Sequence, residues 1–173
     1  MRLYRTPRSA TPESTTLRVA SAALAVAIVL TGCSGGAETV GDCEPMFSEP
    51  ASDSSGIHVL AGSDATYLSD PPTSGPHVAW NAPAILDRQL TAPEQLGVLE
   101  TGDVLVQYRP ADVAEDTVAV LATRLPDRAH LAPNADLPAP VVLTAHLTKQ
   151  LCRSLDTEAI ELFARERAGD PVG

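Results

Sequence analysis

A run of apolar residues near the start of the chain limits where a folded domain can begin. From Val19 to Leu30 the sequence carries no charge, and four arginines but only one acid, Glu13, precede this run. A membrane-spanning helix needs roughly 20 apolar residues, and this run is shorter. A basic segment followed by a short apolar one is typical of an export signal. We therefore expect the globular part to begin after this run and to work outside the cytoplasm.

The apolar run ends in Leu30-Thr31-Gly32-Cys33, which resembles a bacterial lipobox. The resemblance implies that residues 1–32 are a signal peptide cleaved after Gly32. It also implies diacylglycerol and palmitate on Cys33 as a lipid anchor. The alternative is an ordinary secretory signal with a chance cysteine. Because several acyl chains hold a protein firmly to a bilayer, we expect a lipoprotein at the extracytoplasmic face of the cell membrane.

The charge of the remaining chain excludes some partners. Without its first 32 residues the protein has 141 residues, with 8 basic against 21 acidic side chains, and a formal charge of −13. A surface this acidic repels phosphate backbones and anionic headgroups. We expect no nucleic acid partner and no membrane contact except through the lipid, while a protein or small-molecule partner remains open.

Two further cysteines, Cys43 and Cys152, predict a disulfide. Exported proteins fold where thiols oxidise, and both residues would lie in that compartment. The bridge would tie the N-terminal arm to the region where the last helix starts. A redox or metal-binding pair is the alternative, but the two cysteines lack the close C-x-x-C spacing that such pairs show.

The mature chain divides into a tether and one domain. Residues 33–56 contain two stretches of small and polar residues and predict a lipidated flexible tether. Residues 57–173 predict a single α+β domain, a small sheet with helices on one side. Proline, glycine and asparagine are frequent from Gly62 to Gly97, which predicts a long irregular loop region, and such loops are often functional.

Strand and helix signals follow this loop region. Val104–Tyr108 and Val141–His146 are rich in strand formers. Between them, Asp112 and Glu115 predict a capping box for a short helix that ends before Pro126. Asp156 predicts the cap of a last helix, with an apolar face of Ile160, Phe163 and Ala164 and a stop at Gly169.

The run Pro71-Pro72-Thr73-Ser74-Gly75-Pro76-His77 carries a family resemblance. Together with Trp80, Leu99-Glu100-Thr101-Gly102, the strand ending in Tyr108-Arg109-Pro110, and Val141–Ala145, it resembles the bacterial domain-of-unknown-function family 3105. The resemblance spans residues 57–163. It implies a shared fold, and it implies no established activity.

The resemblance also raises a metal hypothesis. Members of this family typically have histidines where this chain has Gly97 and Thr101, beside the shared His77 and Glu100. Imidazoles and a carboxylate suit a divalent transition metal. His77 and Glu100, helped by His58 or His146, are therefore candidate metal ligands, in a site that lacks two family histidines.

Without the family, the same loop supports a plainer interpretation. Thr73, Ser74 and His77 can satisfy polar groups within their own loop. His130 is expected to be a loop residue, and Glu100 and Asp103 to be solvated turn acids. Ser74 lacks the G-x-S-x-G context of a nucleophile, which argues against acyl transfer.

The sequence therefore favours a non-catalytic, lipid-anchored binding or interaction module with a degenerate family site and no cofactor. Its candidate ligand-binding residues share one loop and its surroundings: Thr73, Ser74, His77, Trp80 and Glu100. The alternative is a metal-binding protein or metal-dependent enzyme that uses His77 and Glu100.

Overall fold

The structure, a computed structural model, describes residues 41–169. The predicted signal peptide, Cys33 and the first part of the predicted tether lie outside the described residues. The elements follow one another as β1 (Phe47–Ser48), α1 (Ala92–Glu100), β2 (Val104–Tyr108), α2 (Glu115–Ala122), β3 (Ala129–Pro133), β4 (Val141–Ala145), β5 (Thr148–Cys152) and α3 (Thr157–Arg167). This composition confirms the α+β prediction.

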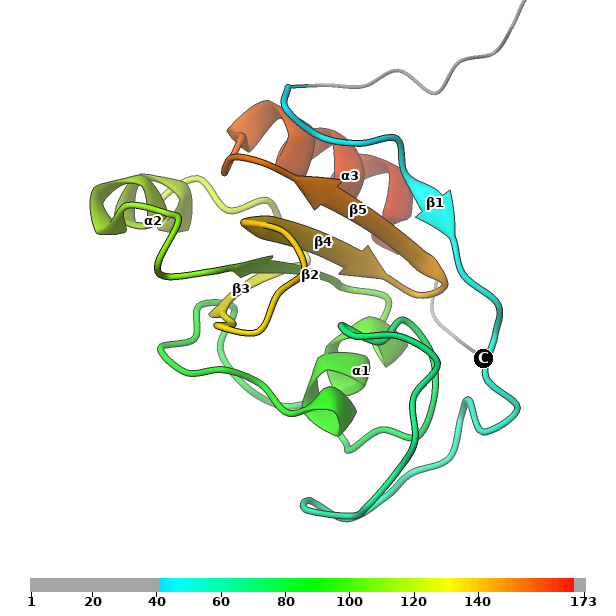
Figure 1. Cartoon of the computed structure of the whole chain (residues 1–173). Coiled ribbons are helices and arrows are strands. Elements are labelled where there is room, and N and C mark those ends of the chain that lie inside the picture. The colour runs from blue at the N-terminus through cyan, green and yellow to red at the C-terminus, as the bar shows by residue number, and fades with distance from the viewer. Residues whose placement is uncertain (1–40, 170–173) are drawn as a thin grey trace, which may run out of the picture. The chain divides into compact units, whose positions relative to one another are not determined.

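The strands form one mixed sheet in the order β1-β5-β4-β2-β3 (Figure 1). Strands β2 and β3 are parallel and joined through α2, while the other neighbours are antiparallel. Leu105 of β2 lies opposite Thr144 of β4 and His130 of β3. Because side chains alternate along a strand, each strand contributes to both faces of the sheet.

One face of the sheet carries the two helices that the sequence predicts. Alternate residues of β2, β3 and β4 point to α2 and α3 and form the larger core, which comprises Val104, Val106, Leu121, Leu131, Val141, Leu143, Ile160 and Phe163 with smaller neighbours. Helix α3 buries its predicted apolar face. Full burial of one such side chain stabilises the fold by about 1.5 to 3 kcal/mol.

The opposite face of the sheet carries α1, so the irregular region predicted from Gly62 to Gly97 is confirmed as far as Thr91, and its last residues are helical. Leu96 and Leu99 of α1 pack with Leu105 and Ala132 in a second core. Pro93 lies in the first turn, where a missing N–H breaks no helical bond. The N–H of Thr91 donates to the Glu94 carboxylate at 2.8 Å and begins the helix.

The predicted helix caps have different outcomes. Asp156 accepts hydrogen bonds from the backbone N–H groups of Glu158 and Ala159 and caps α3 as predicted. The capping box of Asp112 with Glu115 is wrong, because the cap of α2 is Ala114. The Asp112 carboxylate instead pairs with the Arg109 guanidinium.

The N-terminal segment from residue 41 is held on the sheet, although it belongs to the predicted tether. Strand β1 pairs with β5, and the N–H of Glu44 donates to the carbonyl of Leu151. The predicted disulfide is present, with Cα atoms of Cys43 and Cys152 4.0 Å apart. Cys152 is the last residue of β5. Among the described residues no helix is long and apolar enough to cross a bilayer.

We predict that removing the disulfide destabilises the domain by about 4 to 5 kcal/mol, the loop-closure value for a separation of 109 residues. The variant Cys43→Ala/Cys152→Ala should unfold at lower urea concentration than the oxidised protein. Wild-type protein treated with dithiothreitol should match the variant. Two reactive thiols in the untreated, denatured wild type would contradict the bridge.

Candidate functional site

The loop of the family motif is buried, and its hydroxyl groups bind other parts of the chain. All residues from Pro71 to His77 are buried. The Thr73 hydroxyl donates to the Glu49 carboxylate at 2.5 Å, and the Ser74 hydroxyl accepts from the N–H of Ser52 at 2.9 Å. Thr73 and Ser74 therefore fasten the loop to the N-terminal segment.

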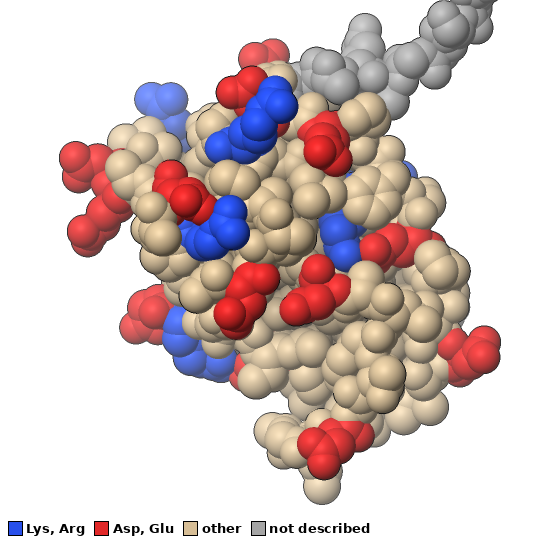
Figure 2. All heavy atoms as spheres, viewed as in Figure 1, with Lys and Arg blue, Asp and Glu red and all other residues tan. Residues whose placement is uncertain are grey.

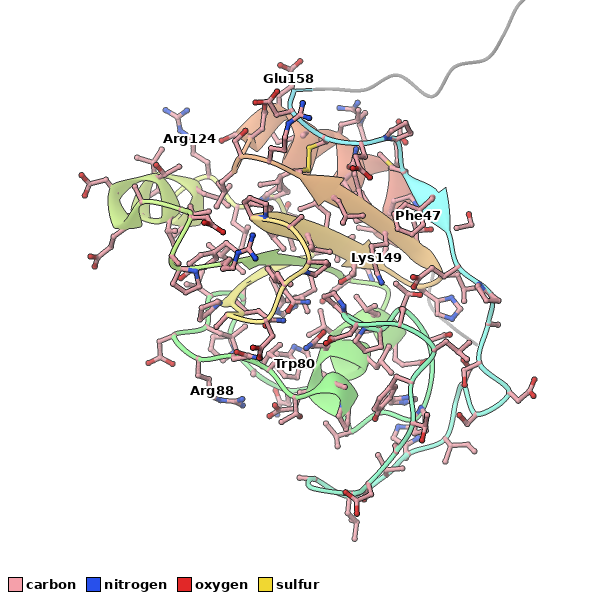
Figure 3. All side chains as sticks on the ribbon, in the orientation of Figure 1. Phe47, Trp80, Arg88, Arg124, Lys149 and Glu158 are labelled. Carbon is pink, nitrogen blue, oxygen red and sulfur yellow. A yellow bond between two sulfur atoms is a disulfide. The ribbon has the colours of Figure 1, made fainter. Side chains whose placement is uncertain are left out.

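A buried ion pair lies where this loop meets the sheet. The Lys149 ammonium, on the face of β5 turned to the loop (Figure 3), lies 2.9 Å from the Glu49 carboxylate, and both side chains are largely buried. Burial raises the pKa of Glu49, but hydrogen bonds from Thr73, Lys149 and Ser69 outweigh burial, and the pKa is lowered overall. The pair thus holds β5, the loop and the N-terminal segment together.

His77 ends the loop and brings two predicted candidates together. Its N–H donates to the carbonyl of Ile57 at 3.0 Å. The His77 ring packs edge-on against the exposed His58 ring, with centroids 4.4 Å apart. Its Nδ1 lies 3.4 Å from the carboxylate of Glu100, the last residue of α1. This Nδ1 has no partner in hydrogen-bond geometry.

His146 approaches the same carboxylate from the turn between β4 and β5. Burial lowers the pKa of His146, and the negative charge of Glu100 acts in the opposite direction. Its Nε2 is buried and has no hydrogen-bond partner. Within residues 41–169, however, no three His, Cys, Asp or Glu side chains are arranged to hold a metal ion.

Trp80 and His130 form a separate cluster. Trp80 packs against the second core (Figure 3), and its ring lies 5.8 Å from the His130 ring. His130 is in β3, which corrects its assignment to a loop, and its Nε2 lies 3.0 Å from Asp103. Asp103 also accepts from Arg128 at 2.9 Å, so it is an ion-paired residue and not a solvated turn acid.

A cleft of about 550 Å³ opens at the N-terminal end of α1. One wall is the segment 65–72, which leads into the family loop, and a second is the segment 89–95. Asn134 and Asp136, which follow β3, complete it. This volume lies in the range of small-molecule sites.

Three buried side-chain amides form a chain that reaches the cleft. Asn134 donates to Gln107 at 2.7 Å, Gln107 donates to Gln95 at 3.1 Å, and Gln95 donates to the carbonyl of Leu90 at 3.0 Å. Gln107 is fully buried in β2, and its two neighbours line the cleft. Each amide is thereby fixed in one orientation before any ligand arrives.

Charges on the face drawn in Figure 2 are mixed, with carboxylates spread across the elements and basic side chains among them. The cleft itself is lined by two acids, Asp70 and Asp136, and by no Lys, Arg or His among the described residues. Its remaining polar groups are hydroxyls and amides.

A comparison with protein families finds a match over most of the described domain. A model of the family described as protein of unknown function (DUF3105) matches residues 58–172. The chain belongs to this family. No curated protein and no solved structure matches the chain. The match includes the buried loop, α1 with Glu100, and every strand except β1.

Gly97 and Thr101, the two positions that entered the metal hypothesis, have structural roles in this chain. A Cβ atom at Gly97 would lie 2.4 Å from the carbonyl oxygen of Val78, so this backbone approach requires glycine. The Thr101 hydroxyl donates to the carbonyl of Val98 and closes the end of α1. In this chain both positions serve the packing of α1.

Sequence reasoning missed the amide chain and the ion pair. Gln107 stands within the apolar run Val104–Tyr108, and Lys149 and Gln150 stand within a strand that was not predicted. A polar residue inside a strand buried on both faces is a signal for a buried network. Applied to Gln107, this rule would have indicated the network without naming its partners.

We predict that Lys149→Met destabilises the domain by about 3 to 5 kcal/mol, because it leaves Glu49 buried and unpaired. The double variant Glu49→Gln/Lys149→Met should recover most of the loss.

The lowered pKa of Glu49 stabilises the fold at pH values above 4.5, the usual pKa of this side chain, and this contribution is lost as the pH falls further. Urea unfolding from pH 7 to pH 3 measures both effects, and additive single variants would contradict the pairing.

Proposed function

We propose that this protein is a lipid-anchored, non-catalytic binding module on the extracytoplasmic face of the cell membrane, and that it binds a small ligand in the cleft at the start of α1. The lipobox-like sequence before Cys33 supports the anchor. The disulfide of Cys43 with Cys152 fits an oxidising compartment.

The amide chain of Asn134, Gln107 and Gln95 is the observation that carries the binding proposal. Buried polar side chains destabilise a fold unless they are hydrogen-bonded, and an apolar core would be simpler to pack. Here the two end members of the amide chain, Gln95 and Asn134, lie at the floor of a cleft. Fixed donors at such a floor lower the ordering cost of binding.

The family loop then serves as the support of the cleft. Its hydroxyls are bound to Glu49 and Ser52, and the Tyr67 hydroxyl, from the cleft wall, donates to the carbonyl of Pro76 at 3.1 Å. The rigid loop therefore holds one wall in place and does not need to offer Thr73 or Ser74 to the ligand.

The anchor is tested by Cys33→Ser. Native protein should occur in the membrane fraction with a lipidated Cys33 as its first residue, because cleavage and acylation are coupled in such precursors. The variant should lose the lipid mass, and it should either be released from the membrane or remain there as the uncleaved precursor. An N-terminus at Met1 on the membrane-bound native protein would contradict this part of the proposal.

The cleft is tested by NMR with a library that holds neutral, cationic and anionic fragments in equal numbers. Hits should shift amides of segments 65–72 and 89–95. Ala92→Phe fills the cleft from the first turn of α1 and should abolish these shifts. Ala119→Phe, an exposed position on α2, is the matched control and should retain them. Hits that persist in Ala92→Phe would refute the cleft as the site.

A second candidate function, divalent metal binding, rests on the two partnerless ring nitrogens beside Glu100. Nδ1 of His77 and Nε2 of His146 are both buried without a hydrogen-bond partner, and neutral imidazole nitrogens are good ligands for Zn²⁺. Small movements of these rings toward Glu100 would give three ligands on one ion.

Elemental analysis separates this candidate from the first. After dialysis against Zn²⁺-free buffer, the domain from Ser34 onward should hold less than one equivalent of metal if the cleft is the functional site. One retained equivalent, lost in His77→Ala and His146→Gln but kept in the exposed control Glu115→Gln, would establish a metal site.

A further inference from the structure

We infer that the ligand of the cleft is an uncharged, polyhydroxylated molecule of the saccharide class, an inference that rests on the proposed binding function. The first argument is charge. Asp70 and Asp136 are exposed carboxylates at the cleft, and the lining includes no basic side chain. An anionic ligand would meet repulsion and no charged partner there.

The second argument is the direction of the amide chain. Gln95 and Asn134 each donate one of their two amide hydrogens within the chain, and their oxygens accept from Gln107 and from the N–H of Asp136. Each therefore has one unused N–H donor. A metal ion or a simple ammonium ion offers no acceptor to these donors, and a buried donor without a partner costs about 1 to 3 kcal/mol.

The rim of the cleft has the opposite character. Asp70 and Asp136 have carboxylate oxygens and Thr66 and Thr91 have hydroxyl oxygens, all of which accept hydrogen bonds. A ligand that suits donors at the floor and acceptors at the rim must accept and donate along its length. Hydroxyl groups do both, and a sugar ring carries several of them.

The third argument is shape. The cleft is large enough for a disaccharide. Tyr67 lines it, and its hydroxyl is held by the carbonyl of Pro76. Its ring can pack on the C–H faces of a sugar while neighbouring hydroxyls bind the floor.

The test uses the mature lipid-anchored protein in a sugar-free detergent and disaccharides that differ in charge. Cellobiose, maltose, trehalose and lactose form the neutral panel. Chitobiose in its deacetylated form, the disaccharide of glucosamine, is the cationic counterpart of cellobiose. Cellobiouronic acid is the anionic counterpart. At least one neutral disaccharide should shift the side-chain NH₂ signals of Gln95 and Asn134, with at least tenfold higher affinity than cellobiouronic acid shows and with no lower affinity than chitobiose shows.

Two variants and one polymer sharpen the test. Gln107 does not line the cleft, and Gln107→Met removes the middle amide of the amide chain. This variant should bind the neutral disaccharide about tenfold more weakly. Glu115→Gln, at an exposed position on α2 outside the cleft lining, should change it less than threefold and serves as the control that folds normally. Co-sedimentation with insoluble cellulose would assign the site to polymer-bound sugar, and shifts with free disaccharide alone to free sugar. Either result supports the inference.

Different results would contradict the saccharide inference and the proposed binding function. Tighter binding of chitobiose or cellobiouronic acid in the cleft would overturn the saccharide class and leave the binding module intact. No shift with any neutral disaccharide, while library fragments still bind the cleft, would have the same meaning. If neither sugars nor fragments reach the cleft, both proposals are refuted.

Discussion

The buried pair of Glu49 and Lys149 is the contact on which the arrangement of the domain depends. It joins three segments that are far apart in the sequence: the N-terminal segment, the family loop and β5. Its desolvation is offset only because Ser69 and Thr73 add hydrogen bonds to the same carboxylate. The ion pair therefore holds the loop in place. The hydroxyl groups of Ser69 and Thr73 in turn stabilise the buried carboxylate of Glu49.

The second constraint acts through α1, which joins the two candidate sites. Its first turn borders the cleft, and its last residue, Glu100, faces His77 and His146. At 1.5 Å per residue, the eight steps from Ala92 to Glu100 separate the two ends by about 12 Å. The close approach of Gly97 to the Val78 carbonyl fixes where this helix lies against the loop.

Local signals predicted those parts of the fold that short-range chemistry determines. The strand Val104–Tyr108, the cap at Asp156 and the disulfide of Cys43 with Cys152 each need only nearby residues or a compartment argument. Helix α1 was missed because Pro93 and Gly97 are both poor helix formers in isolation. Tertiary contacts reverse that preference, since Pro93 lies in the first turn and Gly97 permits the contact with Val78.

Less of the candidate site was accessible from the sequence, because its residues are brought together by the sheet. His77 and Glu100 could be paired from the family pattern, and the structure places them 3.4 Å apart. Gln95, Gln107 and Asn134 have no motif in common. They meet only because α1 lies across β2 and the chain turns after β3, a topology that depends on long-range pairing.

The shared loop decides which substitutions can separate the two candidate sites. The hydroxyl of Tyr67, in the cleft wall, is hydrogen-bonded to the carbonyl of Pro76, which precedes His77. A change in the loop would therefore disturb both the cleft and the histidine cluster formed by His77 and His146. Substitutions at the two ends of α1 avoid this problem, because Ala92 lines the cleft and Glu100 lies beside the histidines. A ligand effect lost in Ala92→Phe but kept in Glu100→Gln therefore belongs to the cleft, and the reverse pattern belongs to the histidine cluster.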